Sequence, residues 1–326
     1  MSSVSEHETG KNSLSSKNTI LEFRQAGFSY EKSSPFINDM SLSVGNGEFI
    51  GLLGANGSGK STILKLASGI LKASKGSIDL WGSPVRTYKN KDRAKLLSYL
   101  PQILDMNVPF TVRELVSMGI YPYEVLPRLT VDEAVEMVGL ADKTESLISN
   151  LSGGERRRVY IAMTLLQGAG LLLLDEPLAN LDIKYQIELL RLLKELREHR
   201  GITVVMALHD INIALQFEKI ILVREGRILS SGNPGAVLTK ELLKKAFDVE
   251  LEIKRHDSGE AYINYENSFW KNQIEHSFSA DSYTVHSPFA HSLRVVDRVS
   301  IRQTAQGKYP VYKLTWLNFR KFLGGF

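Results

Sequence analysis

The chain has 326 residues, and its 43% hydrophobic and 23% charged residues are typical of a globular protein with a sizeable core, not of a disordered chain. The absence of cysteine excludes disulfide bonds, thiolate metal sites and cysteine nucleophiles. The formal net charge is +4, with the excess in residues 269–326 and a nearly neutral remainder, which argues against the broad basic face of a nucleic-acid binder.

The first 19 residues are rich in serine and contain no apolar core. They predict a flexible polar N-terminal tail and no conventional secretory signal. No run of about 18 apolar residues occurs in the sequence, so the chain is not expected to span a membrane by itself.

Residues 20–24 and 28–30 alternate between apolar and polar side chains and predict a strand, and residues 40–44 predict a second one. Tyr30 stands just upstream of a glycine-rich segment. Its ring could stack on a purine, whereas ordinary packing within a strand is the alternative that spacing alone favours.

The glycine-rich segment GANGSGKST occupies residues 54–62, between the apolar run 49–53 and a helical pattern at 63–67. Glycines let such a loop turn its N–H groups toward a polyphosphate, and the helix that follows adds its positive N-terminal end. Lys60 suits the β- and γ-phosphates, and the Ser61 hydroxyl suits a bridging Mg²⁺. The predicted nucleotide-binding residues are Gly54, Asn56, Gly57, Ser58, Gly59, Lys60, Ser61 and Thr62.

The glycine-bounded residues 76–82 predict another strand, and residues 95–100 predict a short one that Pro101 ends. Gln102 then lies in a loop, where it could reach Mg²⁺ or its water, although a loop glutamine taken alone is usually only solvated. From about residue 111 to 167 the pattern is helical, with capping boxes that start at Thr111 and Thr130. Helices are therefore inserted between two halves of a nucleotide-binding sheet.

The motif LSGGE at residues 151–155 precedes a predicted helix. Ser152 and Gly153 suit either a second anion-binding helix end or a plain N-cap, and the motif alone does not separate the two. The three arginines at 156–158 predict a solvated charged face.

Residues 171–174 form an apolar run bounded by Gly170 and Pro177, as in a buried parallel strand. Carboxylates at the end of such a strand are costly unless they are paired or bind a metal. Asp175 suits Mg²⁺, and Glu176 suits the general base that accepts a proton from water. A further strand at 202–208 ends at His209, which could donate to a γ-phosphate or be merely structural.

These pieces, in this order, resemble the ATPase subunit of an ATP-binding cassette (ABC) transporter over about residues 20–266. The resemblance rests on GANGSGKS, the glutamine of YLPQ, LSGGE, LLLLDEP, the turn ANLD that ends at Asp182, and the histidine of ALHD. It implies an α/β fold, a P-loop NTPase of the ABC type with a mixed sheet core and an inserted helical subdomain at about 95–165. ATP and Mg²⁺ are the implied cofactors.

The resemblance also implies roles for individual residues. Tyr30 would stack on adenine, and Gln102 would sense Mg²⁺ and the membrane partner. Ser152, Gly153 and Gly154 would contact ATP held by the opposite subunit, while Asp182 would organise the dimer seam. The implied catalytic residues are Lys60, Gln102, Glu176 and His209, and the implied Mg²⁺ ligands are Ser61, Gln102 and Asp175.

Finer features, among them TVRELVSMGIYPY and LHDINIAL, resemble the branch that imports iron-siderophores, haem or cobalamin. Arg157 departs from the pattern because glutamine is usual there, and it is expected not to touch the chemistry. The implied partners are membrane permease subunits and a second ATPase subunit in a head-to-tail dimer, with no nucleic acid, at the cytoplasmic face of the cell membrane as a peripheral protein. The alternatives are a soluble ABC-type ATPase acting on DNA or the ribosome, and a non-catalytic nucleotide switch.

Residues 267–326 form a basic, aromatic-rich C-terminal extension that falls outside the resemblance. From residue 269 onward it carries 8 Lys or Arg against 3 acids, and residues 295–301 predict a strand. The mixture suits an anionic membrane surface or an accessory interface, and equally a small packed appendage. The extension is expected to regulate or anchor the protein without taking part in chemistry.

Overall fold

The computed structural model describes residues 18–31, 34–104, 109–125, 129–255, 261–264, 283–285, 303–304 and 311–314. Packing divides the chain into two units, residues 1–264 and residues 265–326. All of the predicted tail before residue 18 and the strand predicted at 295–301 lie outside the described residues.

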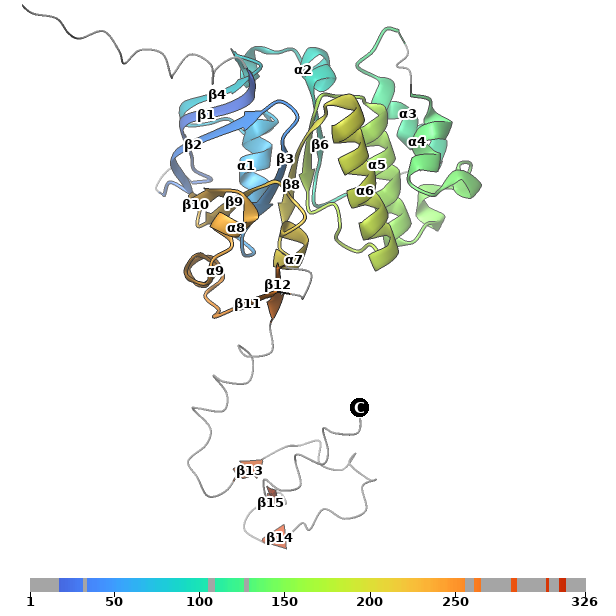
Figure 1. Ribbon diagram of the computed structural model, residues 1–326. Helices are drawn as coiled ribbons and strands as arrows, with labels where there is room; N and C mark the ends of the chain where they lie inside the picture. The colour runs from blue at the N-terminus through green and yellow to red at the C-terminus, as the bar shows by residue number, and fades with distance from the viewer. Residues whose placement is uncertain are drawn as a thin grey trace, which may run out of the picture. The chain divides into compact units, whose positions relative to one another are not determined.

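The first unit combines strands and helices (Figure 1). Its strands are β1 (Thr19–Phe28), β2 (Ile37–Gly45), β3 (Phe49–Leu53), β4 (Lys75–Leu80), β5 (Ser83–Pro84), β6 (Leu97–Leu100), β7 (Leu171–Asp175), β8 (Thr203–Leu208), β9 (Lys219–Arg224), β10 (Arg227–Gly232), β11 (Glu252–Arg255) and β12 (Ala261–Asn264). Its α-helices are α1 (Lys60–Ala67), α2 (Asn90–Leu96), α3 (Val112–Ser117), α4 (Val131–Met137), α5 (Gly153–Leu166), α6 (Ile183–Arg200), α7 (Ile211–Ala214), α8 (Pro234–Val237) and α9 (Lys240–Phe247).

The central element is a six-stranded sheet in the order β10-β9-β3-β8-β7-β6. Strands β9, β3, β8, β7 and β6 run parallel, and only the edge strand β10 pairs antiparallel, with β9. The mixed sheet predicted from the sequence is therefore confirmed. Its inner strands are mostly apolar because layers cover both faces of the sheet.

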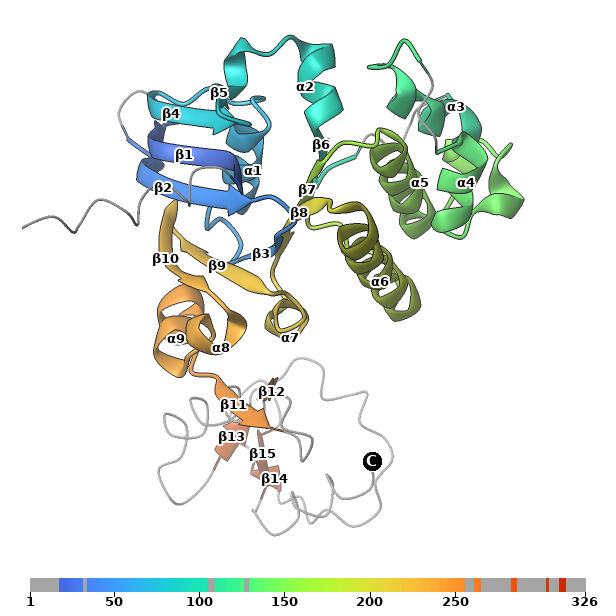
Figure 2. The same cartoon turned by 45° about the horizontal axis from the view of Figure 1, so that its top comes forward.

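The two faces of this sheet belong to two hydrophobic cores. In β7, Leu171 and Leu173 pack into the core that contains α1, while Leu172 and Leu174 pack into the core that contains α5 and α6. Figures 1 and 2 show α1 on one side of the sheet and α5 and α6 on the other. Since each buried leucine contributes about 1.5–3 kcal/mol, β7 is firmly held between the two layers.

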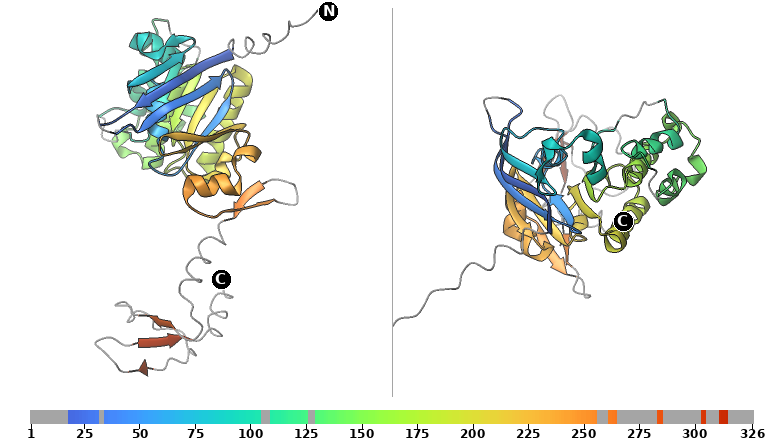
Figure 3. Two further views of the ribbon diagram at one scale, coloured as in Figure 1. Left: turned by 90° about the vertical axis from the view of Figure 1, so that its left-hand side faces the viewer. Right: turned by 90° about the horizontal axis from the view of Figure 1, so that it is seen from above.

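An antiparallel sheet in the order β2-β1-β4-β5 covers α1 from outside. Viewed from above in Figure 3, this sheet lies at one end of the unit and the helices α3 and α4 at the other. Helix α1 is thus enclosed between two sheets, and this fixes the position of the loop from which it starts.

Helices α3, α4 and α5 pack on one another through a shared apolar core. The capping boxes predicted at Thr111 and Thr130 are both present; in the first, Thr111 Oγ1 accepts a hydrogen bond from the Glu114 N–H at 3.2 Å, and Glu114 Oε2 accepts one from the Thr111 N–H at 2.8 Å. Strand β6 falls inside the range 95–165 expected for the helical subdomain, yet it belongs to the six-stranded sheet. The packed helices themselves begin with α3.

The hairpin β11–β12 ends the first unit, and the Ile263 N–H donates to Asn212 Oδ1 in α7 at 2.7 Å. In the second unit, β13 (Tyr283–Val285), β15 (Val311–Leu314) and β14 (Gln303–Thr304) form an antiparallel sheet in that order. Within the described residues, every helix is too short or too polar to cross a membrane.

Candidate functional site

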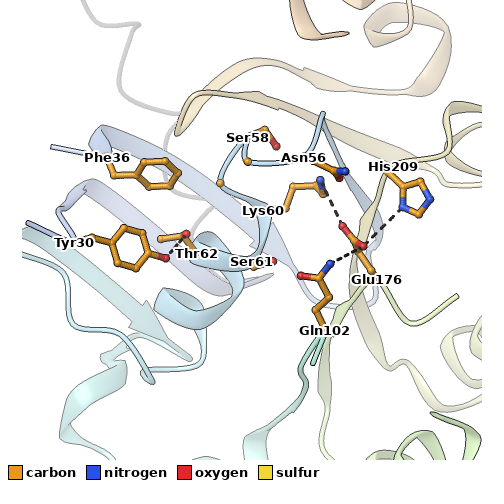
Figure 4. A pocket seen from close by; sticks show the side chains of 12 residues that line it. Tyr30, Phe36, Asn56, Ser58, Lys60, Ser61, Thr62, Gln102, Glu176 and His209 are labelled. Carbon is orange, nitrogen blue, oxygen red and sulfur yellow. Dashed lines mark hydrogen bonds and ion pairs between the residues drawn. The ribbon is translucent and has the colours of Figure 1, made fainter. Parts of the chain in front are cut away.

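A cavity of about 560 Å³ opens between the start of α1 and the ends of the central strands (Figure 4). Most of the residues predicted for the nucleotide site meet there, although they come from distant parts of the chain. The cavity is lined by Tyr30, Phe36, Asn56, Gly57, Ser58, Gly59, Lys60, Ser61, Thr62, Gln102, Glu176 and His209.

The phosphate loop (residues 54–62) connects β3 to α1, as predicted. A Cβ atom at Gly54 would lie 2.3 Å from the Val223 carbonyl oxygen, so only glycine fits this position. Gly59 has φ 110°, a conformation that other residues rarely adopt, and it turns the chain directly into α1. The loop therefore presents backbone N–H groups and a helix N-terminus to the cavity.

Lys60 lies at the base of the cavity and is 4% exposed. Its Nζ donates to the carbonyl oxygens of Gly54, at 2.8 Å, and Ala55, at 3.2 Å, and lies 3.7 Å from Glu176 Oε1. Burial lowers the pKa of Lys60, although the neighbouring carboxylates of Glu176 and Asp175 oppose that shift. A buried cation at the base of a cavity suits the recognition of phosphate.

The cavity wall opposite the phosphate loop is formed by three side chains, each of which follows one of three parallel strands. Gln102 follows β6, Glu176 follows β7 and His209 follows β8. Because β6, β7 and β8 are neighbours and parallel, their carboxyl ends meet at one edge of the sheet. Glu176 is the centre of the group: its Oε2 accepts from Gln102 Nε2 at 3.0 Å and lies 3.9 Å from His209 Nδ1 (Figure 4).

Asp175 is fully buried behind this wall. Its Oδ1 accepts from Ser61 Oγ at 2.9 Å, and its Oδ2 accepts from the Tyr99 hydroxyl at 3.3 Å. Burial raises the pKa of Asp175, while the hydrogen bonds from Ser61 and Tyr99 lower it. Tyr99 is a site residue that the sequence analysis missed, since a tyrosine in a predicted strand carries no signal of the side chain it will reach.

A hydroxyl, a carboxylate and an amide oxygen from Ser61, Asp175 and Gln102 are the hard donors that Mg²⁺ prefers. Within the described residues, no group of three or more His, Cys, Asp or Glu side chains is arranged to hold a metal ion. Three donors do not fill an octahedral site, so Ser61, Asp175 and Gln102 fit an ion that completes its coordination with substrate phosphates and water.

Tyr30 lies at the outer end of the cavity with 62% of its surface exposed. Its hydroxyl is 2.8 Å from Thr62 Oγ1, and its ring meets Phe36 edge-on at 5.6 Å between centroids. Phe36 was not predicted from the sequence, because an aromatic residue before an apolar strand is indistinguishable from a core residue. Together the two rings provide an apolar platform at the mouth of the phosphate site.

Ser152, Gly153, Gly154 and Asp182 do not line this cavity. Ser152 is the N-cap of α5; its Oγ accepts from the Glu155 N–H at 3.3 Å, and Glu155 Oε2 accepts from the Ser152 N–H at 2.8 Å. Asp182 is the exposed N-cap residue of α6 and makes no capping hydrogen bond with its side chain. Within one chain, neither helix start contributes to the lining of the nucleotide cavity.

The prediction of a solvated face at residues 156–158 is wrong for two of the three arginines. Arg157 is 3% exposed and Arg158 is 7% exposed. Consecutive helix positions point about 100° apart, so a run of three cannot share one solvent-facing side. Arg158 donates to the carbonyl oxygens of Val138 and Gly139 and stacks 3.8 Å from the centre of the Tyr185 ring.

The Arg157 side chain points in another direction from Arg158, toward the backbone behind the nucleotide cavity. Its guanidinium donates to the Gln102 carbonyl at 2.8 Å, the Asp175 carbonyl at 2.9 Å, the Pro177 carbonyl at 3.2 Å and the Glu176 carbonyl. Burial lowers the pKa of Arg157, and the charges of Asp175 and Glu176 oppose this. Arg157 does not line the cavity, but it contacts the backbone of two residues that do, Gln102 and Glu176.

A phosphate loop with a buried lysine, facing carboxylates at the ends of parallel strands, defines a nucleoside triphosphatase of the P-loop class. The sequence profile of the ABC transporter family matches residues 37–179. The chain belongs to the ABC transporter family and is one of its ATP-hydrolysing cassettes.

Several named proteins are similar over most of the first unit. The petrobactin import ATP-binding protein FpuC of Bacillus anthracis is 40% identical, over 69% of this chain and 86% of its own. The iron(3+)-hydroxamate import ATP-binding protein FhuC of Bacillus subtilis is 38% identical, over 72% and 89%. The hemin import ATP-binding protein HmuV of Rhodopseudomonas palustris is 36% identical, over 75% and 97%.

A solved structure of cbiO1 from Clostridium perfringens, part of the ABC transporter complex cbiONQ, superposes with a TM-score of 0.60 at 30% identity. The superposition covers 71% of this chain and 97% of that one. The fold of the first unit is therefore that of an ABC cassette, with the mixed sheet and the helices expected from the sequence.

Proposed function

We propose that this chain is the ATP-hydrolysing subunit that powers a membrane permease importing an iron-siderophore, haem or cobalamin. The observation that carries the ATPase role is the pairing of Lys60 and Glu176 across one cavity, with Gln102 and His209 on the same carboxylate. The import role is supported by the similarity to petrobactin, iron-hydroxamate and hemin import proteins over most of their length.

In this function the phosphates of ATP bind along the phosphate loop, and Lys60 neutralises charge on the β- and γ-phosphates. Ser61, Asp175 and Gln102 would hold Mg²⁺, which supplies further charge neutralisation when bound. Glu176 accepts the proton of the attacking water, and His209 holds the γ-phosphate in line. Catalysis consists mainly of positioning and electrostatic stabilisation, since phosphoryl transfer needs little covalent chemistry from the protein.

A second copy of the chain completes each site. At the start of α5, Ser152, Gly153 and Gly154 are exposed or half-exposed and do not line their own cavity, so they can contact ATP bound to the partner. Asp182 lies at another exposed helix start and would organise the seam between the copies. Tyr30, with Phe36 beside it, would stack on adenine.

The protein would act at the cytoplasmic face of the cell membrane as a peripheral subunit bound to the permease. Closing two cassettes around ATP and reopening them after hydrolysis would then move the permease between conformations. Residues 267–326 lie outside the catalytic motifs, and their proposed role is to regulate or anchor the ATPase domain at 20–266. Truncation after Asn267 should preserve MgATP binding and basal hydrolysis while weakening membrane or partner association.

The test of import is uptake by cells in which this gene is deleted. Labelled ferric siderophore, haem and cobalamin are offered separately, and the deletion is complemented with the wild type, Glu176→Gln or the control Glu195→Gln, which changes an exposed residue of α6. Uptake of one ligand should return with the wild type and the control but not with Glu176→Gln. Unchanged uptake of all three ligands in the deletion strain, or purification of the chain with ribosomes instead of a permease, would contradict the proposal.

A further inference from the structure

Four backbone carbonyl groups near the cavity wall that carries Gln102, Glu176 and His209 accept hydrogen bonds from one side chain. They belong to Gln102 in the loop after β6 and to Asp175, Glu176 and Pro177 at the end of β7, and all accept hydrogen bonds from the guanidinium of Arg157. Arginine carries five N–H donors in a rigid fork, so a single side chain can hold two separate loops in one geometry.

In the part of the chain that the structure describes, these four carbonyl groups are the hydrogen-bond partners of Arg157. It is 3% exposed, and among the residues that the structure describes no carboxylate lies within ion-pair distance of it. A buried charge is costly unless it is compensated, and here the compensation comes from the carbonyl dipoles of the site and from the charges of Asp175 and Glu176. The guanidinium is therefore fixed to the backbone from which Gln102 and Glu176 project.

The backbone that it holds is in a demanding conformation. Glu176 has φ 51°, in the left-handed region that side chains other than glycine rarely adopt. Such a conformation persists only where the surroundings fix it, and it often occurs at functional sites. Arg157 contacts the carbonyl group of Glu176 and those of the residues on either side, so it restrains both peptide units that flank the strained residue.

We propose that Arg157 is a positioning residue of the ATPase site, which fixes the carboxylate of Glu176 and the amide of Gln102 by holding their backbones together. Arg157 lies five positions after Ser152 in α5, so it also links the helix offered to the partner's ATP with the wall of its own site. This inference rests on the proposed role of Glu176 as the base. It gives Arg157 a part in turnover, although its side chain does not line the cavity.

The test compares Arg157 with its neighbour Arg158, which is also buried and also donates to two backbone carbonyls, but in the helical region away from the cavity. Arg157→Met removes every donor while keeping an extended apolar side chain, and Arg157→Gln keeps an amide that can serve one or two carbonyls. Arg158→Met is the matched control. Turnover, KM for MgATP, thermal unfolding and backbone amide exchange are measured on each full-length variant.

For Arg157→Met, kcat should fall about tenfold to a hundredfold, the effect of misplacing a catalytic group, with KM for MgATP changed less than about threefold. Arg157→Gln should lie between Met and the wild type. Amide exchange near Glu176 should be faster in Arg157→Met than in the wild type or Arg158→Met. In a Glu176→Gln background, Arg157→Met should have little further effect on kcat, because both changes act through one group.

A wild-type kcat in Arg157→Met would overturn the inference. An equal loss of kcat in Arg158→Met would also overturn it if the two variants have similar, lowered melting temperatures. The cause would then be general destabilisation. A loss of kcat without faster exchange near Glu176 would refute the action through the backbone. If the wild type itself has no turnover, the proposed function fails instead, and the exchange measurement alone decides whether Arg157 holds this backbone.

Discussion

The two walls of the nucleotide cavity are built in different ways. The phosphate loop (residues 54–62) is one continuous segment that binds mainly with its backbone, and its residues lie within nine positions of one another. The opposite wall takes Gln102, Glu176 and His209 from the ends of three strands spread over more than a hundred positions. In the proposed function, the local segment binds the phosphates and the tertiary assembly provides the groups for hydrolysis.

Because of this difference, the two walls should respond differently to mutation. A backbone-built wall depends on glycine conformations and on the start of α1, so a side-chain change elsewhere leaves it intact. The opposite wall includes Glu176, whose carboxylate contacts Lys60 and Gln102 and whose backbone carbonyl accepts a hydrogen bond from Arg157. Mutations at the second wall should therefore lower turnover far more than they lower ATP affinity.

The largest separation of binding from hydrolysis is expected from Glu176→Gln. Loss of the general base should lower kcat at least about a hundredfold, while MgATP still binds through the intact phosphate loop. Phosphate release and equilibrium MgATP binding are measured side by side, with the exposed Glu195→Gln as control. Unchanged turnover in Glu176→Gln would mean that another residue activates the water and that the strand-end wall has been misassigned.

The next prediction asks whether a third region, the start of α5, completes the site from a second copy. Lys60→Ala should disable the subunit's own phosphate loop, and Ser152→Arg should disable the site of its partner. Each variant alone should be nearly inactive, whereas an equal mixture should regain at most roughly a quarter of wild-type activity, because half of the dimers keep one intact composite site. Full activity per subunit in a highly diluted monomer would eliminate the shared site.

A smaller effect is expected from Tyr99→Phe, which removes the hydroxyl that donates to Asp175 Oδ2. Losing one such bond costs about 1 kcal/mol, so KM for MgATP should rise about fivefold. The bond favours the ionised carboxylate and so lowers the pKa of Asp175; without it the pKa rises, and activity on the acid side should fail at a higher pH. Tyr88→Phe, which loses a hydroxyl bonded to the Leu80 carbonyl at 2.7 Å, is the control and should leave the pH profile in place.

The smallest effect concerns the capping box at the start of α5. Hydrogen bonds from Lys143 and from the Ser152 backbone lower the pKa of Glu155 from 4.5 to about 2. The folded-state pKa lies below the unfolded one, so the stabilisation is present above about pH 4.5 and is lost as the pH falls toward 2. Glu155→Gln should lower the free energy of unfolding by about 1 kcal/mol at neutral pH. Denaturant unfolding at pH 7 and pH 3 should show the difference shrinking; an equal loss at both pH values would exclude a charge effect.

Local patterns were enough to predict the phosphate loop, the buried strands and the capping boxes. Each depends on residues within a few positions of one another: glycines and Lys60 in the loop, an unbroken apolar run in β7, and a threonine followed by Glu114 or Glu133 in the boxes. The acid pair at 175–176 was also visible, because charges at the end of an apolar strand need a compensating partner.

The sequence by itself determined which segments become the loop, the strands and the helix starts, since their conformations follow from local sterics, hydrogen bonding and hydrophobic period. Only the tertiary structure decided which side chains meet. The register of β6, β7 and β8 brings Gln102 to Glu176, and the antiparallel pairing of β1 with β2 brings Phe36 beside Tyr30. The packing of α5 turns Arg157 inward to the carbonyl groups of Gln102 and Glu176. An arginine in a charged run has the same local pattern whether it is solvated or buried, because the carbonyls that compensate its charge lie on other elements.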